Sequence, residues 1–152
     1  IAEVMLGRAE KAFNYYKKIA PTTHNKIAQT HMTEAYVYSQ FIAGKDSPEF
    51  GRAKNSWLTG SATWNFIAVT WYILGMRPDY QGLRITPCIP SHWNGFRLRR
   101  QFRKAIYEIE VRNPRQVSQG VESITVDGKK IKGNILPLFK PGSSHQVKVI
   151  MG

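Results

Sequence analysis

The sequence predicts an α+β protein in which helices come first and strands follow. Before residue 75, three stretches carry the apolar spacing, caps and breakers that are typical of helices. After residue 75, short segments rich in β-branched residues alternate apolar and polar side chains, which is the period of a strand. Because the two patterns do not interleave, we expect two segregated units joined at GMRPDYQG, residues 75–82.

Three helices are expected in the first half of the chain. The first spans residues 2–19, where apolar residues recur every three or four positions, and Pro21 ends it. The second spans residues 33–43, between a possible cap and a loop dense in Gly, Pro, Asp and Ser. The third starts within residues 59–61 and runs to Leu74. It has apolar residues on most faces, so we expect it to be deeply buried.

The second half contains short segments that we expect to pair as antiparallel strands. Gly, Pro and Asn separate them. The dipeptide Asp127-Gly128 predicts a two-residue hairpin turn, because both positions tolerate a positive φ. The segments are GLRITPCIP, FRLRRQF, AIYEIEVRN, VESITVDGKKIKG, NILPLF and HQVKVIMG.

The net charge of +12 is high for 152 residues, and most of it lies in residues 81–152. A basic excess can neutralise the phosphates of a nucleic acid. However, RLRRQFRK alternates as a half-buried strand does, and no nucleic-acid-binding motif accompanies the charge. We therefore favour a solvated strand and expect no nucleic acid partner.

The single cysteine, Cys88, excludes an internal disulfide and provides no metal-binding spacing, which favours a reducing compartment. The longest apolar run, residues 66–74, is too short to span a bilayer, so no membrane partner is expected. The chain starts at Ile1 within an expected helix. We therefore expect it to be the C-terminal piece of a longer polypeptide.

A cluster of Thr59, Gly60 and Ser61 stands at the expected start of the third helix. A helix start presents unpaired backbone N–H groups and can hold an anion such as phosphate. The same residues also make an ordinary helix cap. Spacing alone favours the cap.

Other polar residues give weaker indications. Four carboxylates could act as acid or base, but a capping or solvated role explains each equally well; they are Glu34, Asp46, Glu49 and Asp79. His24 and His31 lack a third ligand at a recognisable spacing, so surface or hydrogen-bonded histidines are favoured over a metal site. No nucleophile-elbow motif supports a Ser/His/Asp hydrolase. The four tryptophans are interpreted as core residues or as platforms for sugar rings.

Several stretches in order resemble the C-terminal region of glycoside hydrolase family 94, most closely its cellobiose phosphorylases. The resemblance covers nearly the whole chain. It rests on TEAYVYSQFIAGKD, AKNSWLTGSATWNF, ILGMRPDYQGLRITPCIP, WNGFRLRRQFRKAIYEIEVRNP and ITVDGKKIKGNILPLF.

The resemblance implies a large cytoplasmic enzyme, often a homodimer. It would contain an N-terminal β-sandwich, a linker, an α/α six-fold barrel and a C-terminal jelly-roll-like β-sandwich. Residues 1–76 would be the last barrel helices, and residues 77–152 the antiparallel β-sandwich. The remainder of the same polypeptide would then be the chain's principal partner.

The implied reaction is inverting phosphorolysis without a metal or other cofactor. Inorganic phosphate attacks the anomeric carbon of cellobiose or a related β-linked disaccharide, giving α-D-glucose 1-phosphate and glucose. An aspartic acid protonates the leaving oxygen. The resemblance places this acid upstream of Ile1, so no catalytic residue is assigned here and the isolated chain is expected to be inactive.

The resemblance also implies three phosphate-binding residues in this chain. They are Gln40 in the YVYSQ stretch, and Thr59 and Gly60 in SWLTG. One departure from the family pattern is Ala35, where we expect proline; proline is favoured at the start of a helix but not required.

Two kinds of alternative remain open. Within the family, the enzyme could be a chitobiose or cellodextrin phosphorylase. Outside it, residues 81–152 could form a non-catalytic carbohydrate-binding module, or a nucleic-acid-binding module driven by charge.

Overall fold

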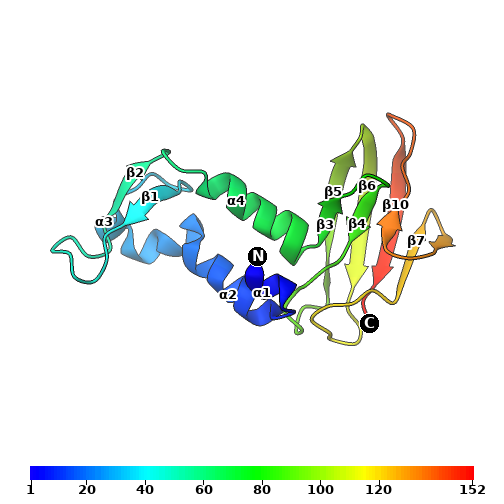
Figure 1. Cartoon of the computed structure of the whole chain (residues 1–152), viewed down its shortest axis with the longest axis horizontal. Helices are drawn as coiled ribbons and strands as arrows, with labels where there is room; N and C mark the ends of the chain where they lie inside the picture. The colour runs from blue at the N-terminus through cyan, green and yellow to red at the C-terminus, as the bar shows by residue number, and fades with distance from the viewer. The chain divides into compact units, whose positions relative to one another are not determined.

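The computed structural model describes every residue, 1–152, and the chain forms two compact units. One unit comprises residues 14–68, and the other comprises residues 1–13 together with residues 69–152. The elements of both units are labelled in Figure 1. The expected boundary after residue 76 refers to domains of a longer protein, and it stays a prediction.

The expected helix over residues 2–19 is broken into two. Helix α1 spans Ala2–Met5 and helix α2 spans Ala9–Ile19. Between them Gly7 has a φ of 71°, and its N–H donates to the carbonyl of Val4 at 2.9 Å. The N–H of Arg8 donates to the carbonyl of Glu3 at 2.8 Å. This pair of bonds around a left-handed glycine is a Schellman motif, which terminates a helix.

Pro21 follows the end of α2, as expected, and begins a 3-10 segment, η1, over Pro21–Ile27. Helix α3, Ala28–His31, follows directly and ends at Met32, whose φ of 56° is left-handed. A residue with positive φ stops an α-helix because the next turn cannot close.

The helix expected over residues 33–43 is wrong. Strand β1, Ser39–Ile42, occupies its second half and pairs antiparallel with β2, Ala53–Ser56, with Phe41 opposite Lys54. The segment that leads into β1 is rich in aromatic and β-branched residues, which favour strands. The Gly-, Pro- and Asp-containing stretch after it is the loop of the β1–β2 hairpin.

The third helix starts where it was expected. Helix α4 spans Ser61–Ile67, and a π-helical segment, η2, continues it over Ala68–Ile73. The expected deep burial is wrong in this chain, because Trp64 is 65% exposed and Phe66 is 59% exposed. No other element covers these side chains, so a helix that is apolar on most faces buries only some of them.

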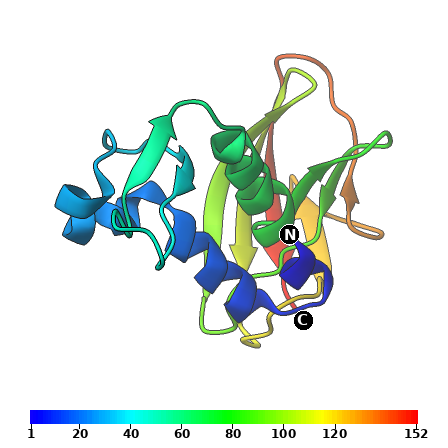
Figure 2. The ribbon, with the colours of Figure 1, turned by 60° about the vertical axis from the view of Figure 1, so that its left-hand side comes forward.

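Two sheets form the second unit. The larger has the order β5-β6-β10-β7-β8, and the smaller has the order β3-β4-β9. Figure 2 shows β3 and β4 in green beside the longer strands of the larger sheet. The bounds are Met76–Pro78 (β3), Leu83–Ile85 (β4), Gly95–Phe102 (β5), Ala105–Arg112 (β6), Ser123–Val126 (β7), Lys129–Ile131 (β8), Ile135–Leu136 (β9) and Ser144–Ile150 (β10).

Not all neighbouring strands are antiparallel, which corrects the expectation. Strand β10 lies between β6 and β7, antiparallel to β7 but parallel to β6, with Val147 opposite Ile109. An alternating sequence shows which residues face the core but not the direction of the neighbouring strand. The Asp127-Gly128 turn between β7 and β8 is confirmed, with φ values of 49° and 81°.

The core of this unit lies on one face of the larger sheet and on the smaller sheet. The hydroxyl of Tyr107, in β6, donates to the carbonyl of Pro137, just after β9, at 2.9 Å and so links the two sheets. The large side chains of this core that are fully buried are Met76, Leu83, Ile85, Ile89, Tyr107, Ile109, Val111, Ile124, Leu136, Val147, Val149 and Met151.

The basic stretch RLRRQFRK lies in and just after β5, and β5 alternates between exposed and half-buried residues, as expected of a solvated strand. Arg97 pairs with Glu110 at 2.8 Å, and Arg99 pairs with Glu108 at 3.1 Å, both across the β5–β6 pair. Their positive charge is therefore partly neutralised within the sheet. No helix in the structure has the length and apolar character needed to cross a membrane.

Candidate functional site

The three expected phosphate-binding residues all belong to the unit of residues 14–68. Gly60 caps α4, and Thr59 precedes it. The N–H of Ser61 donates to Thr59 Oγ1 at 3.1 Å, and the hydroxyls of Thr59 and Ser61 are 2.8 Å apart. The two hydroxyls hold two hydrogens and share one hydrogen bond, so one hydrogen remains to donate to a ligand.

Gln40 lies in β1, and its side chain is oriented by its neighbour across the hairpin. Asn55 Nδ2 donates to Gln40 Oε1 at 2.8 Å. With its oxygen engaged in this way, the Gln40 amide presents Nε2, a hydrogen-bond donor, away from Asn55. Gln40 is therefore available as a neutral donor.

A cavity of about 280 Å³ brings some of these groups together. Gln40 and Ser61 line it, with Asn65, whose Nδ2 donates to the carbonyl of Ser61 at 2.8 Å. Thr59 and Gly60 do not line the cavity, but they adjoin Ser61 in the chain. Lys18 is the only lysine or arginine in the lining. The cavity thus offers neutral donors and one cation, a combination that suits an anion.

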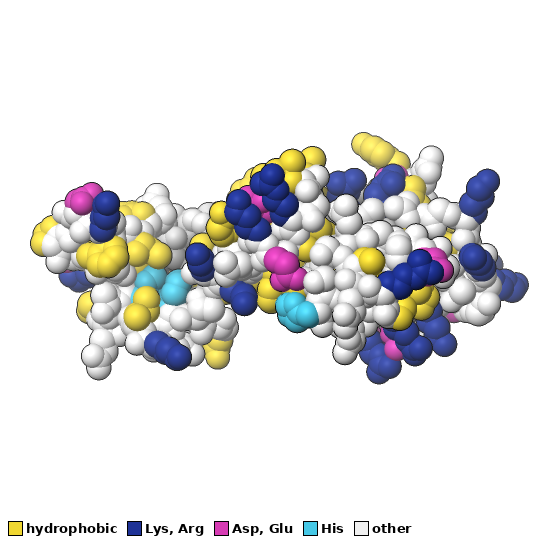
Figure 3. All heavy atoms as spheres, turned by 90° about the horizontal axis from the view of Figure 1, so that it is seen from below, with side chains coloured by type: hydrophobic (Ala, Val, Ile, Leu, Met, Phe, Trp, Pro, Cys, Tyr) yellow, Lys and Arg dark blue, Asp and Glu magenta, His cyan; other side chains and the backbone are white.

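Two histidines line the same cavity, and one of them, His31, makes a hydrogen bond to the backbone of Gly51. His31 is 3% exposed, and its ring centroid lies 4.2 Å from that of His24. The Nδ1 atoms of both rings are buried and have no hydrogen-bond partner. Figure 3 shows histidine side chains at the left of the molecule, next to hydrophobic side chains.

The environment of His31 favours its neutral form. Burial lowers the pKa of His31 most, the neighbouring His24 lowers it further, and a hydrogen bond to the backbone of Gly51 opposes the shift. No group of three or more side chains in this chain could hold a metal ion.

Most of the candidate carboxylates have structural partners. Asp79 accepts two hydrogen bonds from Arg84, at 2.6 and 3.1 Å, which hold the pKa of Asp79 below its ordinary value. Glu49 pairs with Arg52 and Lys54. Glu34 accepts a bond from Trp57 Nε1 at 3.2 Å. Lowered pKa values keep these groups ionised, which is the opposite of what a general acid requires. Asp46 is exposed.

A hydrogen-bonded series of Asp, His and Ser lies at the start of β10. Asp127 Oδ2 is 2.6 Å from His145 Nδ1, and His145 Nε2 is 2.8 Å from Ser143 Oγ. However, Ser143 Oγ donates its hydrogen to the carbonyl of Lys140 at 2.6 Å, and the His145 ring stacks on Phe139. The hydroxyl is held by its own loop, so this series fastens the β7–β8 hairpin to β10 and is not a nucleophilic centre.

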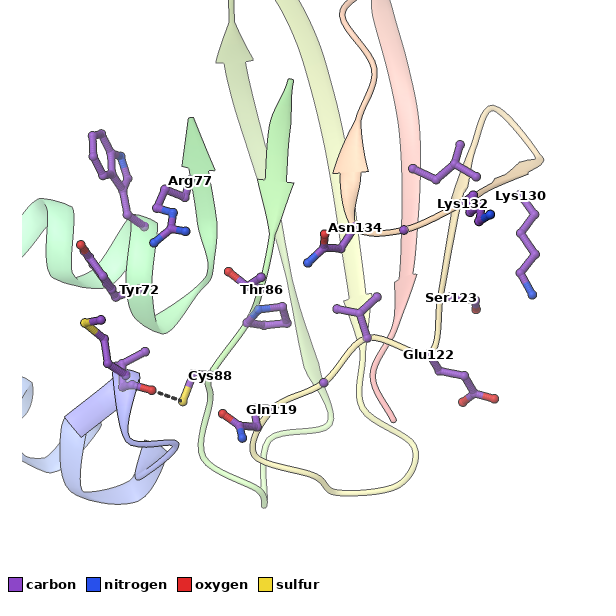
Figure 4. Close-up of a pocket in the computed structure, with 18 residues that line it drawn as sticks. Tyr72, Arg77, Thr86, Cys88, Gln119, Glu122, Ser123, Lys130, Lys132 and Asn134 are labelled. Carbon is purple, nitrogen blue, oxygen red and sulfur yellow. Dashed lines mark hydrogen bonds between the residues drawn. The ribbon is translucent and has the colours of Figure 1, made fainter. Parts of the chain in front are cut away.

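A larger cavity, of about 740 Å³, lies in the other unit. Figure 4 shows Tyr72 and Arg77 on one side of it, with Asn134 and Gln119 extending toward that side from separate loops. Cys88 is buried there, 3.9 Å from the carbonyl of Val4, and burial raises the pKa of its thiol. Sequence reasoning missed this cavity, because its lining comes from several distant segments that share no motif.

Two family models match the chain in succession. Residues 1–75 match the model described as "Glycosyl hydrolase 94 superfamily, catalytic domain". Residues 76–132 match the model described as "Glycosyl hydrolase family 65, C-terminal domain".

Curated relatives match over the full length of this chain. It is 46% identical over 152 residues to the N,N'-diacetylchitobiose phosphorylase of Vibrio proteolyticus, covering 100% of this chain and 19% of that protein. It is 43% identical to the enzyme of the same name from Vibrio furnissii, again over 100% of this chain and 19% of the relative. The solabiose phosphorylase of Paenibacillus borealis is 36% identical over 99% of this chain and 20% of its own length.

The chain therefore spans about a fifth of the length of the relatives that it matches. The two family models together cover residues 1–132, and the first of these relatives matches the whole chain. The chain belongs to the glycosyl hydrolase 94 superfamily, whose catalytic-domain model covers its first 75 residues.

Proposed function

We propose that this chain is the C-terminal part of an inverting disaccharide phosphorylase and that it supplies Gln40, Thr59 and Gly60 to the phosphate site. The observation that carries the proposal is the end-to-end match, at 46% identity, to a relative named as a phosphorylase. The donor groups of Gln40 and of the Thr59–Ser61 pair, described above, support the phosphate assignment.

The substrate is a β-linked disaccharide, and N,N'-diacetylchitobiose is the first candidate. Two of the relatives are named for that sugar and a third is named for solabiose. Cellobiose, the substrate expected from the sequence, is now the second candidate, followed by cellodextrins. Phosphorolysis of N,N'-diacetylchitobiose yields N-acetylglucosamine 1-phosphate and N-acetylglucosamine.

In the proposed reaction a phosphate oxygen forms a bond to the anomeric carbon, and the bond from that carbon to the glycosidic oxygen breaks. An aspartic acid in the remainder of the polypeptide protonates the leaving oxygen. The residues of this chain hold the phosphate for in-line attack. Neutral donors suit this task because they fix the anion without taking the negative charge that makes it nucleophilic.

Gly60 contributes space as well as a backbone N–H. Its φ of −78° is available to any residue, and a Cβ there would meet nothing closer than the Trp64 ring at 3.6 Å. The fold of this chain therefore does not require glycine at residue 60. An anion that lies against the backbone would explain why residue 60 is glycine, because a side chain there would occupy the space of the anion.

The test uses the full-length protein with N,N'-diacetylchitobiose or cellobiose, with and without inorganic phosphate, and measures the sugar 1-phosphate. We expect product only with phosphate. Thr59→Val should lower kcat/KM for phosphate about 100-fold, as the loss of one positioned donor does in other enzymes. Thr59→Ser keeps the hydroxyl and should retain most of the activity.

Release of free sugar without phosphate would identify a hydrolase and overturn the proposal. Failure to turn over any β-linked disaccharide, with sugar binding retained, would favour the carbohydrate-binding module instead. Full activity of the Thr59→Val variant would show that Thr59 does not bind the phosphate.

The proposal also covers the compartment, the oligomeric state and the cofactor requirement of the enzyme. We expect the full-length protein to be a cytoplasmic homodimer that needs no metal or organic cofactor, since phosphate is itself the substrate. Activity should therefore survive exhaustive treatment with a chelator, and the mass in solution should be that of two chains.

A further inference from the structure

The cavity of about 740 Å³ belongs to the unit of residues 1–13 and 69–152, and the proposed phosphate site uses none of the residues that line it. Its volume is that of a cavity for a small organic ligand. The lining comes from α1, η2, β3, the residues after β4, the loop between β6 and β7, and the stretch from β8 to β9. The charges and polar groups of this lining show which class of ligand fits.

Positive charge predominates in the lining. Arg77, Lys130 and Lys132 are its cations, and Glu122 is its only carboxylate. Glu122 Oε1 lies 3.1 Å from Nη2 of Arg115, which is not a lining residue, so the negative charge already has a partner. None of the three cations forms an ion pair in the chain. The cavity therefore carries a net positive charge that favours an anionic ligand.

Arg77 is the most informative of these cations. It lies in β3 directly opposite Arg84 of β4. Two like charges opposite each other destabilise a pair of strands. Arg84 is neutralised by Asp79, since its Nη2 lies 2.6 Å from Asp79 Oδ2, but Arg77 has no such partner. The fold gives the charge of Arg77 no favourable contact, whereas an anion in the cavity would provide one.

Neutral hydrogen-bonding groups lie within reach of Arg77. Strand β4 separates β3 from β9, and the carbonyl of Asn134, just before β9, accepts the N–H of Ile85 at 2.8 Å. Two strand spacings, about 10 Å, therefore separate the backbones of Arg77 and Asn134. Figure 4 shows these two side chains extending toward each other, with Thr86 between them. The Asn134 side chain makes no hydrogen bond within the chain, so its amide is available to a ligand.

The rest of the polar lining is neutral. Gln119 provides an amide, Ser123 a hydroxyl, and Tyr72 an aromatic ring with a hydroxyl. Amides and hydroxyls both donate and accept hydrogen bonds, as the hydroxyl groups of a sugar require. A bare phosphate ion would use the cations alone and would fill a small part of the cavity. A sugar phosphate uses both kinds of group.

We propose that this cavity binds a phosphorylated monosaccharide, with its phosphate against Arg77 and Asn134 and its hydroxyl groups toward the neutral lining. The planar guanidinium of Arg77 can donate two hydrogen bonds to one phosphate. The inference goes beyond the proposed function and does not depend on turnover. The sugar 1-phosphate formed in the proposed reaction is one ligand of this class.

Equilibrium dialysis of the full-length protein against radiolabelled N-acetylglucosamine 1-phosphate counts the bound molecules per chain. We expect two, one at the proposed phosphate site and one in this cavity. Arg77→Gln should weaken one of them about 30-fold, which corresponds to a lost charge-assisted hydrogen bond. Asn134→Ala should weaken the same one about fivefold, for a lost neutral hydrogen bond.

Two further variants are matched controls. Arg97 is an exposed arginine of β5 that pairs with Glu110 and does not line the cavity. We expect Arg97→Gln to leave both bound molecules unchanged. Thr59→Val should weaken only the molecule at the proposed phosphate site.

Thermal unfolding separates ligand binding from a structural role of Arg77. Arg77→Gln removes a like charge opposite Arg84, so without ligand the variant should unfold at a Tm no lower than that of the wild type. The sugar phosphate should raise the Tm of the variant less than that of the wild type. A variant with a lower Tm and an undiminished rise would assign Arg77 to the fold and overturn the proposal.

The dialysis distinguishes this proposal from the proposed function. One bound molecule per chain, unaffected by Arg77→Gln, would overturn the cavity site and leave the phosphate site standing. One bound molecule that Arg77→Gln weakens and Thr59→Val does not would support the cavity site and remove the phosphate site. If inorganic phosphate displaces the label from the cavity as well as unlabelled sugar phosphate does, the sugar makes no contribution and the proposed class of ligand is wrong.

Discussion

At the scale of single residues, Asn113 shows how one buried amide organises a loop region. It directly follows β6 and is 1% exposed. Its Nδ2 donates to the carbonyls of Trp93, Val117 and Ser91, at 3.1, 2.8 and 3.4 Å, and its Oδ1 accepts the N–H of Val117 at 3.0 Å. A side chain of this size satisfies backbone groups from two separate segments, so its removal leaves them buried and unpaired.

We expect Asn113→Ala to lower the free energy of unfolding by about 2 kcal/mol, within the range for leaving buried partners unsatisfied. Denaturant unfolding of the chain, followed by circular dichroism, measures the change. The control is Asn94→Ala at an exposed position, which should cost less than about 0.5 kcal/mol. Equal costs for the two variants would contradict the role given to Asn113.

At the scale of elements, glycine is required at two positions for different physical reasons. Gly128 has a φ of 81°, and a Cβ there would meet no atom within 4 Å. Gly75 has a φ of 74°, but a Cβ there would lie 2.1 Å from the carbonyl carbon of Thr86. Gly75 also accepts the N–H of Thr86 at 2.9 Å, at the start of the β3–β4 pair. At residue 128 glycine is favoured only because φ is positive. At residue 75 φ is also positive, and a Cβ would in addition clash with the backbone of Thr86.

The two glycines therefore predict unequal effects of the same substitution. Gly128→Ala should destabilise the chain by about 1 kcal/mol, the cost of a left-handed conformation for a residue with a Cβ. Gly75→Ala adds a clash with rigid backbone and should cost more than about 4 kcal/mol, because β3 and β4 must separate. Thermal unfolding of the two variants side by side tests this order, and a similar shift in Tm for both would refute it.

At the scale of the whole molecule, exposed apolar side chains accumulate between β2 and the end of α4. Trp57 is 72% exposed, Leu58 69%, Trp64 65% and Phe66 59%. Monomeric soluble proteins rarely expose so many large apolar groups together. The surface contrasts with the sheet unit, whose core residues are almost fully covered.

We expect residues 1–152, produced alone, to self-associate and to bind a hydrophobic dye, because this apolar surface is in contact with water. Light scattering and dye fluorescence measure both properties. The double substitution Trp64→Gln and Phe66→Gln should reduce them, while the same double change at the exposed pair Tyr80 and Leu138 should have a smaller effect. A monomeric chain that binds no dye would contradict the prediction.

The sequence by itself indicated strands in the second half of the chain and the Asp127-Gly128 turn. These features depend on alternation and on φ preferences, which are local properties. It also indicated Gln40, Thr59 and Gly60 as phosphate-binding residues, through the resemblance to a family. Their role is a prediction that the experiments above test.

Only the tertiary structure decided the remaining features. Residues 33–43 have helix-compatible spacing, but Met32 and Tyr36 adopt positive φ and the segment that follows gains a partner strand in β2. The parallel β6–β10 pair and the adjoining rings of His24 and His31 likewise depend on contacts between segments that are distant along the chain or separated by turns. Spacing along a sequence does not encode such contacts, because they arise only when the chain folds and buried groups compete for the same partners.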